Sequence, residues 1–317
     1  MKIGFIGLGN VGGKLAGSLL RNGFDLTVRD LNQGIARPFL DNGAKWAETP
    51  KHLAEAVDLI ITCLPNPATS VTVLEADDGV LAGISTGKIW AEMSTTDEEE
   101  VKRLGAKVKA LGGEALDCPV SGGCHRAATG NISIFVGGER SSFEKILPVM
   151  KVLGRRILHT GDLGSASVLK VMTNYLATAN LVTLCEALTT AKKAGMDLST
   201  TYEAIRISSG NSFVHETESQ VILNGSREIN FTMDLVLKDI SLFQAIAERA
   251  GVPLEVSPLL IDIFKDGEER YGSREWSSNI VRRLEDACDT QVIASGFPAE
   301  MVDDEPEVSG TEVVARV

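Results

Sequence analysis

The sequence predicts an α/β fold in two parts, an N-terminal doubly wound parallel sheet and an all-helical C-terminal domain. Residues 1–162 alternate short apolar stretches with helical patterns, as a parallel sheet with crossover helices requires. From Gly164 to about residue 290, only helical periods occur. We therefore expect domains at residues 1–162 and 163–290, and a separate tail at residues 291–317.

The strands of the first domain are expected where apolar runs end in Gly, Pro, Asn or Ser. Runs such as Leu59-Ile60-Ile61 are continuous rather than alternating, which is typical of strands covered on both faces. Two of the expected strands, Ile132 to Val136 and Arg156 to His159, would extend the sheet beyond the other five. The expected strands are Ile3 to Gly7, Asp25 to Asp30, Leu59 to Leu64, Lys88 to Met93, Glu114 to Cys118, Ile132 to Val136 and Arg156 to His159.

The second domain is expected to be built on one long helix. The run from Ser165 to Ala194 is rich in small and apolar residues and would span roughly 45 Å as a single helix. The stretch from Gln291 to Val317 differs, because it holds six acidic residues, one Arg and no clear period. It predicts an extended or loosely ordered acidic tail.

The bulk composition excludes several classes of function. The chain has 317 residues and a formal net charge of −12, which disfavours binding to nucleic acid or an acidic membrane. No run of about 18 apolar residues occurs, so no membrane span is expected. Five scattered cysteines give neither zinc nor CxxC spacing, and no signal peptide is expected. These features predict a cytoplasmic protein without a metal site.

A G-x-G-x-x-G motif lies between the first expected strand and a helical pattern. The first glycine makes a tight turn, the second lets the backbone approach a pyrophosphate, and the third lets helix pack on strand. The helix N-terminus then stabilises the phosphate charge. The alternative is a strand–helix turn without a ligand. We favour a dinucleotide site formed by Gly7, Leu8, Gly9, Asn10, Val11 and Gly12.

Asp30 ends the second strand, about 20 residues after the glycine motif. A carboxylate at this place accepts hydrogen bonds from the adenosine ribose and repels a 2′-phosphate. Leu31 rather than Arg follows it, although Arg29 and Arg37 lie nearby in the sequence. The sequence therefore favours NAD, with NADP less expected. The alternative is that Asp30 only caps the next helix.

Two further strand ends are expected to line the dinucleotide crevice. Turns at the carboxyl ends of parallel strands form such crevices. Leu64 and Pro65 follow one strand and are candidate walls for the cofactor, and Thr95 follows the next strand and supplies a hydroxyl near the nicotinamide.

Ser121, Gly122 and Gly123 follow the strand that ends at Cys118. A serine hydroxyl beside bare backbone N–H groups forms a concavity suited to a carboxylate. A tight turn that needs glycine for its backbone angles is the alternative. Beside a cofactor turn, we favour anion binding.

Lys170 and Asn174 are spaced by four residues in the long predicted helix. Four residues is about one turn, so the ammonium and the amide share one face. The neighbours Val168, Leu169 and Val171 are apolar, and an ionisable group in such a setting is a candidate for a functional site. A solvated surface lysine is the alternative.

Four motifs in this order resemble those of the β-hydroxyacid dehydrogenases over about residues 1–290. That family includes 3-hydroxyisobutyrate dehydrogenase and tartronate semialdehyde reductase. The motifs are the glycine turn, Asp117 to Gly123, Gly161 to Asn174, and Lys238-Asp239.

The resemblance implies a Rossmann domain like the NAD-binding domain of 6-phosphogluconate dehydrogenase, a helical domain, and a homodimer or homotetramer. It implies Lys170 as the catalytic lysine and Asn174 as its orienting partner. It also implies Ser121, Gly122 and Gly123 at the substrate carboxylate. Lys238 is implied near both nicotinamide and substrate, although a surface pair with Asp239 or Asp234 is the alternative.

The chain departs from the family pattern in several places. Val11 stands where Met is usual, and the stretch from Cys124 to Ile132 replaces one that usually continues toward Gly-Thr-Leu. Some members carry Arg in a Ser-Gly-Arg-Ser stretch where this chain has Asn211. The loss of that guanidinium argues against a second, distal carboxylate on the substrate. Ala166 and Thr173 replace the usual Gly and Asn.

The reaction expected is hydride transfer between NAD and a small β-hydroxy acid or its semialdehyde, with Lys170 as general base or acid. Glycerate-like, isobutyrate-like and succinic-semialdehyde-like compounds all fit. Two alternatives use the same scaffold: a non-catalytic dinucleotide-binding sensor and an imine reductase. A sensor needs no proton donor, and imine reductases generally lack this lysine.

Overall fold

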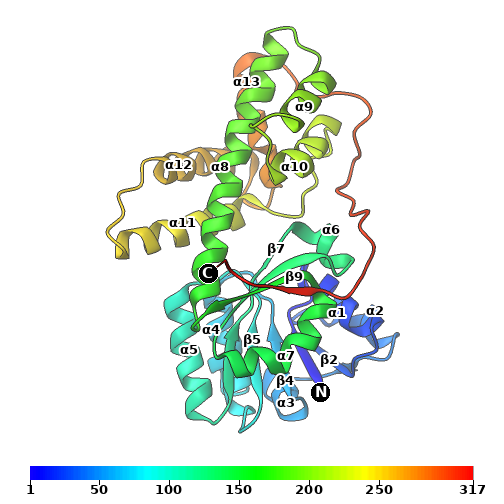
Figure 1. The fold of residues 1–317 in the computed structure, drawn as a ribbon, viewed down its shortest axis with the longest axis vertical. Helices are drawn as coiled ribbons and strands as arrows, with labels where there is room; N and C mark the ends of the chain where they lie inside the picture. Colours follow the sequence, from blue (N-terminus) through cyan, green and yellow to red (C-terminus); the bar gives the residue numbers. More distant parts are fainter. Residues whose placement is uncertain (317) are drawn as a thin grey trace. The chain divides into compact units, whose positions relative to one another are not determined.

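The computed structural model describes residues 1–316, and its contacts divide them into two units (Figure 1). Unit 1 holds Met1–Lys170 together with residues 303–316, and unit 2 holds Val171–Val302. This division differs from the expected one in two ways. The first turns of the long helix belong with the sheet, and the end of the tail returns to unit 1.

Unit 1 is built on a mixed sheet in the order β10-β9-β8-β6-β5-β4-β1-β2-β3, with β7 paired to β8. The part β3-β2-β1-β4-β5-β6 is all parallel and has the strand order of dinucleotide-binding folds. The strands are β1 (Ile3–Ile6), β2 (Leu26–Arg29), β3 (Lys45–Trp46), β4 (Leu59–Thr62), β5 (Ile89–Glu92), β6 (Glu114–Asp117), β7 (Val120–Ser121), β8 (Ile132–Gly137), β9 (Gly154–Gly161) and β10 (Thr311–Val313).

Helices cover both faces of this sheet (Figure 1). They are α1 (Gly12–Arg21), α2 (Arg37–Leu40), α3 (Pro50–Ala56), α4 (Pro67–Glu75), α5 (Glu98–Ala110), α6 (Gly123–Ala128) and α7 (Arg140–Leu153), with short 3₁₀ turns η1 (Gln33–Ala36) and η2 (Val80–Ala82). Leu59 and Ile61 pack into one apolar layer with α1 and α7, whereas Ile60 packs into the other layer with α3, α4 and α5. Alternate residues of one strand are thus buried on opposite faces, which explains the continuous apolar runs.

The predicted doubly wound sheet is confirmed, with differences at its edges. The expected extension by Ile132 to Val136 and Arg156 to His159 is confirmed as β8 and β9, but β8 runs antiparallel to β6. The strands β3 and β7 have two residues each, too short to show a pattern in the sequence.

The acidic tail is extended, as expected, but it is bound rather than loose. Its strand β10 pairs in parallel with β9. Glu307 accepts two-pronged hydrogen bonds from Arg21, at 3.0 and 3.1 Å from Nη2. Gly310 donates its N–H to the carbonyl of Lys151 at 2.7 Å. Long-range ion pairs of this kind leave no periodic pattern in a sequence.

Unit 2 is helical, as expected, and its core is formed where its helices meet. The helices are α8 (Ser165–Lys193), α9 (Leu198–Arg206), α10 (Phe213–Asn224), α11 (Met233–Arg249), α12 (Val256–Tyr271), η3 (Ser277–Val281) and α13 (Arg282–Cys288). The single long helix predicted from Ser165 is confirmed as α8, whose first residues belong to unit 1. Within residues 1–316, no helix has both the length and the apolar character to span a membrane.

Candidate active site

The glycine turn joins β1 to α1 at the point where the sheet changes direction between β1 and β4. Gly7 has φ +97°, and a Cβ on it would lie 2.3 Å from the carbonyl oxygen of Cys63 at the end of β4. A Cβ on Gly12 would lie 2.1 Å from the carbonyl oxygen of Gly7. Close backbone packing therefore requires glycine at both positions. Ligands of doubly wound sheets bind in the crevice at this point of the sheet.

Gly9 differs from the other two glycines because a Cβ there would meet nothing within 4 Å. Its backbone therefore faces open space, at the position where the motif lets a pyrophosphate approach. The residues present thus fit a bound dinucleotide. Leu8 is buried against the apolar core, whereas Asn10 is exposed.

Asp30 follows β2 and is tied to the glycine turn. Its Oδ2 accepts a hydrogen bond from the N–H of Leu8 at 2.7 Å, and its Oδ1 accepts one from the N–H of Asn32 at 2.9 Å. The N-cap of the following 3₁₀ turn is Asn32, whose own side chain accepts from Gly34. The carboxylate is therefore held beside the glycine turn, and the helix-capping role falls to Asn32.

The ends of β4 and β5 are joined by a chain of hydrogen bonds. The N–H of Leu64 donates to Ser94 Oγ at 2.7 Å, and Ser94 in turn bonds the buried carboxyl of Glu92 through its N–H and its hydroxyl. Burial raises the pKa of this carboxyl. The strands β4 and β5 are parallel neighbours. Leu64 and Pro65 follow β4, and Thr95 follows β5.

The Ser-Gly-Gly turn begins on β7 and ends at the start of α6. Gly122 and Gly123 have φ values of +130° and +89°, so both need glycine. Ser121 is the last residue of β7 and is half-buried. Burial raises the pKa of the nearby Cys118 thiol well above its usual value, the opposite of the shift found in an activated thiolate.

Lys170 lies in the second turn of α8, with 7% of its surface exposed. It is the one buried lysine within the described part of the chain. Burying an ammonium is costly, so a lysine in such a place needs a partner or a function. The solvated-lysine alternative is therefore wrong.

Asn174, one turn further along α8, is held by a buried aspartate of α11. Its Nδ2 donates to Asp239 Oδ2 at 2.5 Å, and Asp239 is 2% exposed. Because an ionised carboxylate only accepts, this bond fixes which end of the amide faces Asp239. The carbonyl oxygen of Asn174 therefore points elsewhere.

Lys238 also pairs with Asp239. Its Nζ lies 2.9 Å from Asp239 Oδ1, as an ion pair rather than an aligned hydrogen bond. The pair is largely buried, and Asp234 instead binds Arg274 at 3.0 Å. Lys238, Asp239 and Asn174 therefore form one connected group within unit 2.

Comparisons with known proteins cover both units. Residues 2–161 match the family model described as the NAD binding domain of 6-phosphogluconate dehydrogenase. Residues 164–284 match the model described as NAD-binding of NADP-dependent 3-hydroxyisobutyrate dehydrogenase. The 2-(hydroxymethyl)glutarate dehydrogenase of Eubacterium barkeri is 34% identical over 283 residues, which cover 89% of this chain and 94% of that protein.

The chain belongs to the β-hydroxyacid dehydrogenase family. The 2-hydroxy-3-oxopropionate reductase of Escherichia coli is 32% identical over 90% of this chain and 97% of that protein. A crystal structure of 3-hydroxyisobutyrate dehydrogenase from Salmonella typhimurium has a TM-score of 0.82 at 27% identity, covering 89% of this chain and 99% of that one. An imine reductase from Myxococcus stipitatus shares the fold alone, with a TM-score of 0.62 at 18% identity.

Residues that depart from the pattern of β-hydroxyacid dehydrogenases make contacts of their own. Arg126 of α6 pairs with Glu305 of the tail at 3.4 Å, and burial lowers the pKa of His125 beside it. Asn211 donates to Glu216 at 2.7 Å. Neither Glu305 nor Glu216 is among the predicted site residues.

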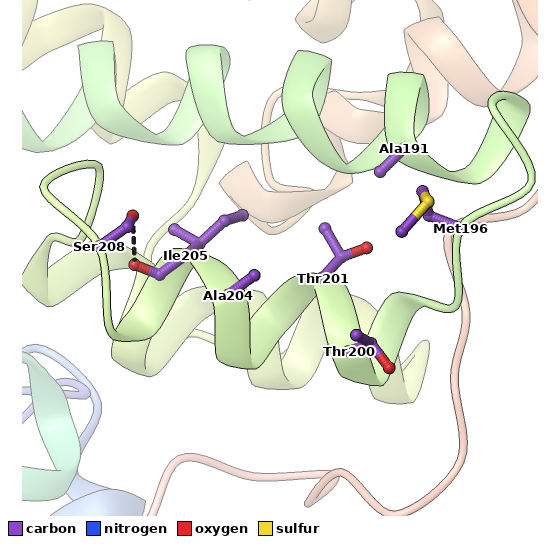
Figure 2. A pocket seen from close by; sticks show the side chains of 7 residues that line it. All are labelled: Ala191, Met196, Thr200, Thr201, Ala204, Ile205 and Ser208. Atoms are coloured by element: carbon purple, nitrogen blue, oxygen red, sulfur yellow. Dashed lines mark hydrogen bonds between the residues drawn. The ribbon is translucent and has the colours of Figure 1, made fainter.

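One apolar groove of about 380 Å³ lies between the end of α8 and α9 (Figure 2). It contains none of the predicted site residues. The hydroxyl of Ser208, one of its lining residues, donates to the carbonyl of Ile205 at 2.9 Å. Within residues 1–316, no group of His, Cys, Asp or Glu side chains could hold a metal ion.

Sequence reasoning missed the long-range bonds of two buried aspartates. Asp239 holds Asn174, and Asp117 of β6 binds the start of α8. Both stand inside motifs that the sequence shows, but only a partner far along the chain reveals what they do.

Proposed function

We propose that this member of the β-hydroxyacid dehydrogenase family interconverts a small β-hydroxy acid and its semialdehyde with a nicotinamide dinucleotide. The observation that carries the proposal is the burial of Lys170 within a chain whose sheet presents a glycine turn at its switch point. When bound, the cofactor supplies a hydride acceptor or donor. The chain's own residues must hold the substrate and move one proton.

Lys170 is proposed as the group that moves this proton. In oxidation it takes the proton of the substrate hydroxyl, and in reduction it returns a proton to the carbonyl oxygen. Asn174 is proposed to orient it. Because Asp239 takes the amide N–H of Asn174, the carbonyl oxygen of this side chain can accept from the ammonium or from the substrate hydroxyl.

The substrate carboxylate is proposed to bind at Ser121, Gly122 and Gly123. Both glycines have positive φ, and their backbone N–H groups are proposed to bind the anion. Lys238, held by Asp239, is proposed near both substrate and nicotinamide. Holding the carboxylate fixes the reacting carbon relative to the proton donor, which can contribute several kcal/mol.

NAD is proposed as the preferred cofactor. The carboxylate of Asp30, held by the N–H of Leu8, is proposed to accept from a ribose hydroxyl and to repel a 2′-phosphate. Leu31 is 93% exposed and offers no cation. Arg29 stacks over Trp46, 5.1 Å from the ring centre, and Arg37 pairs with Asp41 at 3.7 Å.

The test is a spectrophotometric screen that follows NADH and NADPH with cyclic imines and with small hydroxy acids and semialdehydes of glycerate, isobutyrate and succinate type. Turnover of at least one pair supports the proposal. Tight NADH binding without turnover of any acid would favour a sensor, and turnover of cyclic imines alone would favour an imine reductase.

A homodimer or homotetramer is also proposed, from the family resemblance. Light scattering coupled to size-exclusion chromatography tests it, because a mass near 33.8 kDa would mean a monomer.

A further inference from the structure

The carboxylate of Asp117 binds the first turn of α8. Its Oδ1 accepts from the N–H of Gly164 at 2.8 Å. Its Oδ2 accepts from both the N–H and the hydroxyl of Ser167, at 2.7 and 2.8 Å. The first N–H groups of a helix have no partner within the helix, and an aspartate is among the best side chains to satisfy them. One buried side chain thus closes the start of a 29-residue helix.

The surroundings of Asp117 are shaped to hold this carboxylate. Asp117 is fully buried, at 0% exposure. A Cβ on Gly137 of β8 would lie 2.3 Å from Asp117 Oδ1 and 2.9 Å from Ser165 Oγ. Apolar packing adds to the polar anchor, because a Cβ on Gly105 of α5 would lie 2.4 Å from Leu163 just before the helix. The start of α8 therefore has one defined position on the sheet of unit 1.

Asp117 connects the Ser-Gly-Gly turn, proposed to bind the substrate carboxylate, with the helix that carries Lys170. It is the last residue of β6, and Ser121 of the Ser-Gly-Gly turn follows four residues later. Lys170 follows Ser167 by three residues, a rise of about 4.5 Å along the helix axis. Because Lys170 is so close to Ser167 along the helix, any shift of the helix start would displace Lys170 by about the same distance as the shift itself.

We propose that Asp117 is a positioning residue, which fixes Lys170 relative to the Ser121-Gly122-Gly123 turn by binding Gly164 and Ser167. This inference rests on the proposed function, since it concerns the same proton transfer. It assigns to Asp117 a role in the rate of reaction beyond stabilising the fold.

A double-mutant cycle separates these two roles. Asp117→Asn removes one acceptor, and a displacement of Lys170 should lower kcat roughly 10- to 100-fold while the KM for the dinucleotide stays unchanged. In a Lys170→Ala background, with an added alkylamine to restore measurable turnover, Asp117→Asn should cause no further loss, because its effect acts through Lys170. Amide hydrogen exchange should speed up at residues 164–170.

Asp197 offers a matched control. Its Oδ1 accepts from the N–H and the hydroxyl of Thr200, at 2.7 and 2.8 Å, which is the pattern that Asp117 makes with Ser167. It caps α9, which carries no proposed site residue. Asp197→Asn should leave kcat unchanged and loosen exchange only at the start of α9. Should Asp117→Asn fail to fold, Ser167→Ala removes a single bond and enters the same cycle.

Equal losses from Asp117→Asn in the wild-type and Lys170→Ala backgrounds would overturn the inference, as would exchange at residues 164–170 that does not change. Failure of the proposed function is a separate result. If the wild-type protein turns over no acid at all, the exchange measurement alone decides whether Asp117 fixes the start of α8.

Discussion

Two turns of unit 1 and one side-chain group of unit 2 hold their proposed site residues by different means. In unit 1, the glycine turn and the Ser-Gly-Gly turn are set by the backbone: Gly7, Gly122 and Gly123 have positive φ, and Gly12 packs against a carbonyl. In unit 2, Asn174 and Lys238 are set by one side chain, Asp239. Adding a methyl group should therefore be the damaging change at these two turns of unit 1, whereas removing a charge should be the damaging change at the Asp239 group of unit 2.

The largest effect is expected at the glycine turn. Gly12→Ala places a methyl group against a backbone carbonyl that cannot move aside, so stability should fall by about 1–3 kcal/mol and dinucleotide binding should be lost. Gly9→Ala should fold normally and still lose dinucleotide binding, because its Cβ enters open space. Thermal unfolding and NADH fluorescence titration check both variants.

Gly17 in the middle of α1 is the matched control, since a Cβ there also meets nothing within 4 Å. Gly17→Ala should keep dinucleotide binding and raise stability by up to about 1 kcal/mol. Equal binding by Gly9→Ala and Gly17→Ala would contradict the placement of the cofactor.

A smaller effect is expected at Asp239. Asp239→Leu removes the acceptor of Asn174 and the counter-charge of Lys238, and the lost charged hydrogen bond corresponds to about 1.5–3 kcal/mol, or roughly 10- to 100-fold in kcat/KM. Steady-state kinetics with the best substrate measures the loss. Asp234→Leu, which frees Arg274 instead, serves as the control.

Cofactor preference should shift by a comparable or smaller factor. Asp30→Ser together with Leu31→Arg removes the repelling carboxylate and adds a cation for a 2′-phosphate. The ratio of kcat/KM for NADPH over NADH should rise at least about tenfold, the equivalent of about 1.4 kcal/mol. A wild-type enzyme that already prefers NADPH would contradict the role proposed for Asp30.

The smallest effect is expected in the tail. The hydrogen bond with Arg140 lowers the pKa of Glu312 below its usual 4.5. The pair therefore stabilises unit 1 at neutral pH, and this contribution is lost as pH falls below that value. Glu312→Gln should lower stability by about 0.5 kcal/mol at neutral pH and by nothing in acid, as denaturant unfolding would show. Glu144→Gln, on the other side of Arg140, is the control.

The same contrast explains which features could be predicted from the sequence and which could not. The backbone devices of unit 1 are local, so the glycine turn, Asp30 and the Ser-Gly-Gly turn could be predicted from spacing, as could the long helix α8. Asp117 could not, because its partners Gly164 and Ser167 lie 47 and 50 residues away. The bond between Asn174 and Asp239 and the ion pairs of the tail escaped for the same reason. Their roles depend on which segments the fold brings together.

The proposed chemistry is tested most directly by replacing one amine. Lys170→Met should lower kcat by roughly 10²- to 10⁴-fold and leave the dissociation constant of the dinucleotide unchanged, with partial recovery on adding small alkylamines. Lys192→Met, at the other end of α8, should retain full activity. If Lys170→Met turns over substrate as fast as the wild type, the account of this site is wrong.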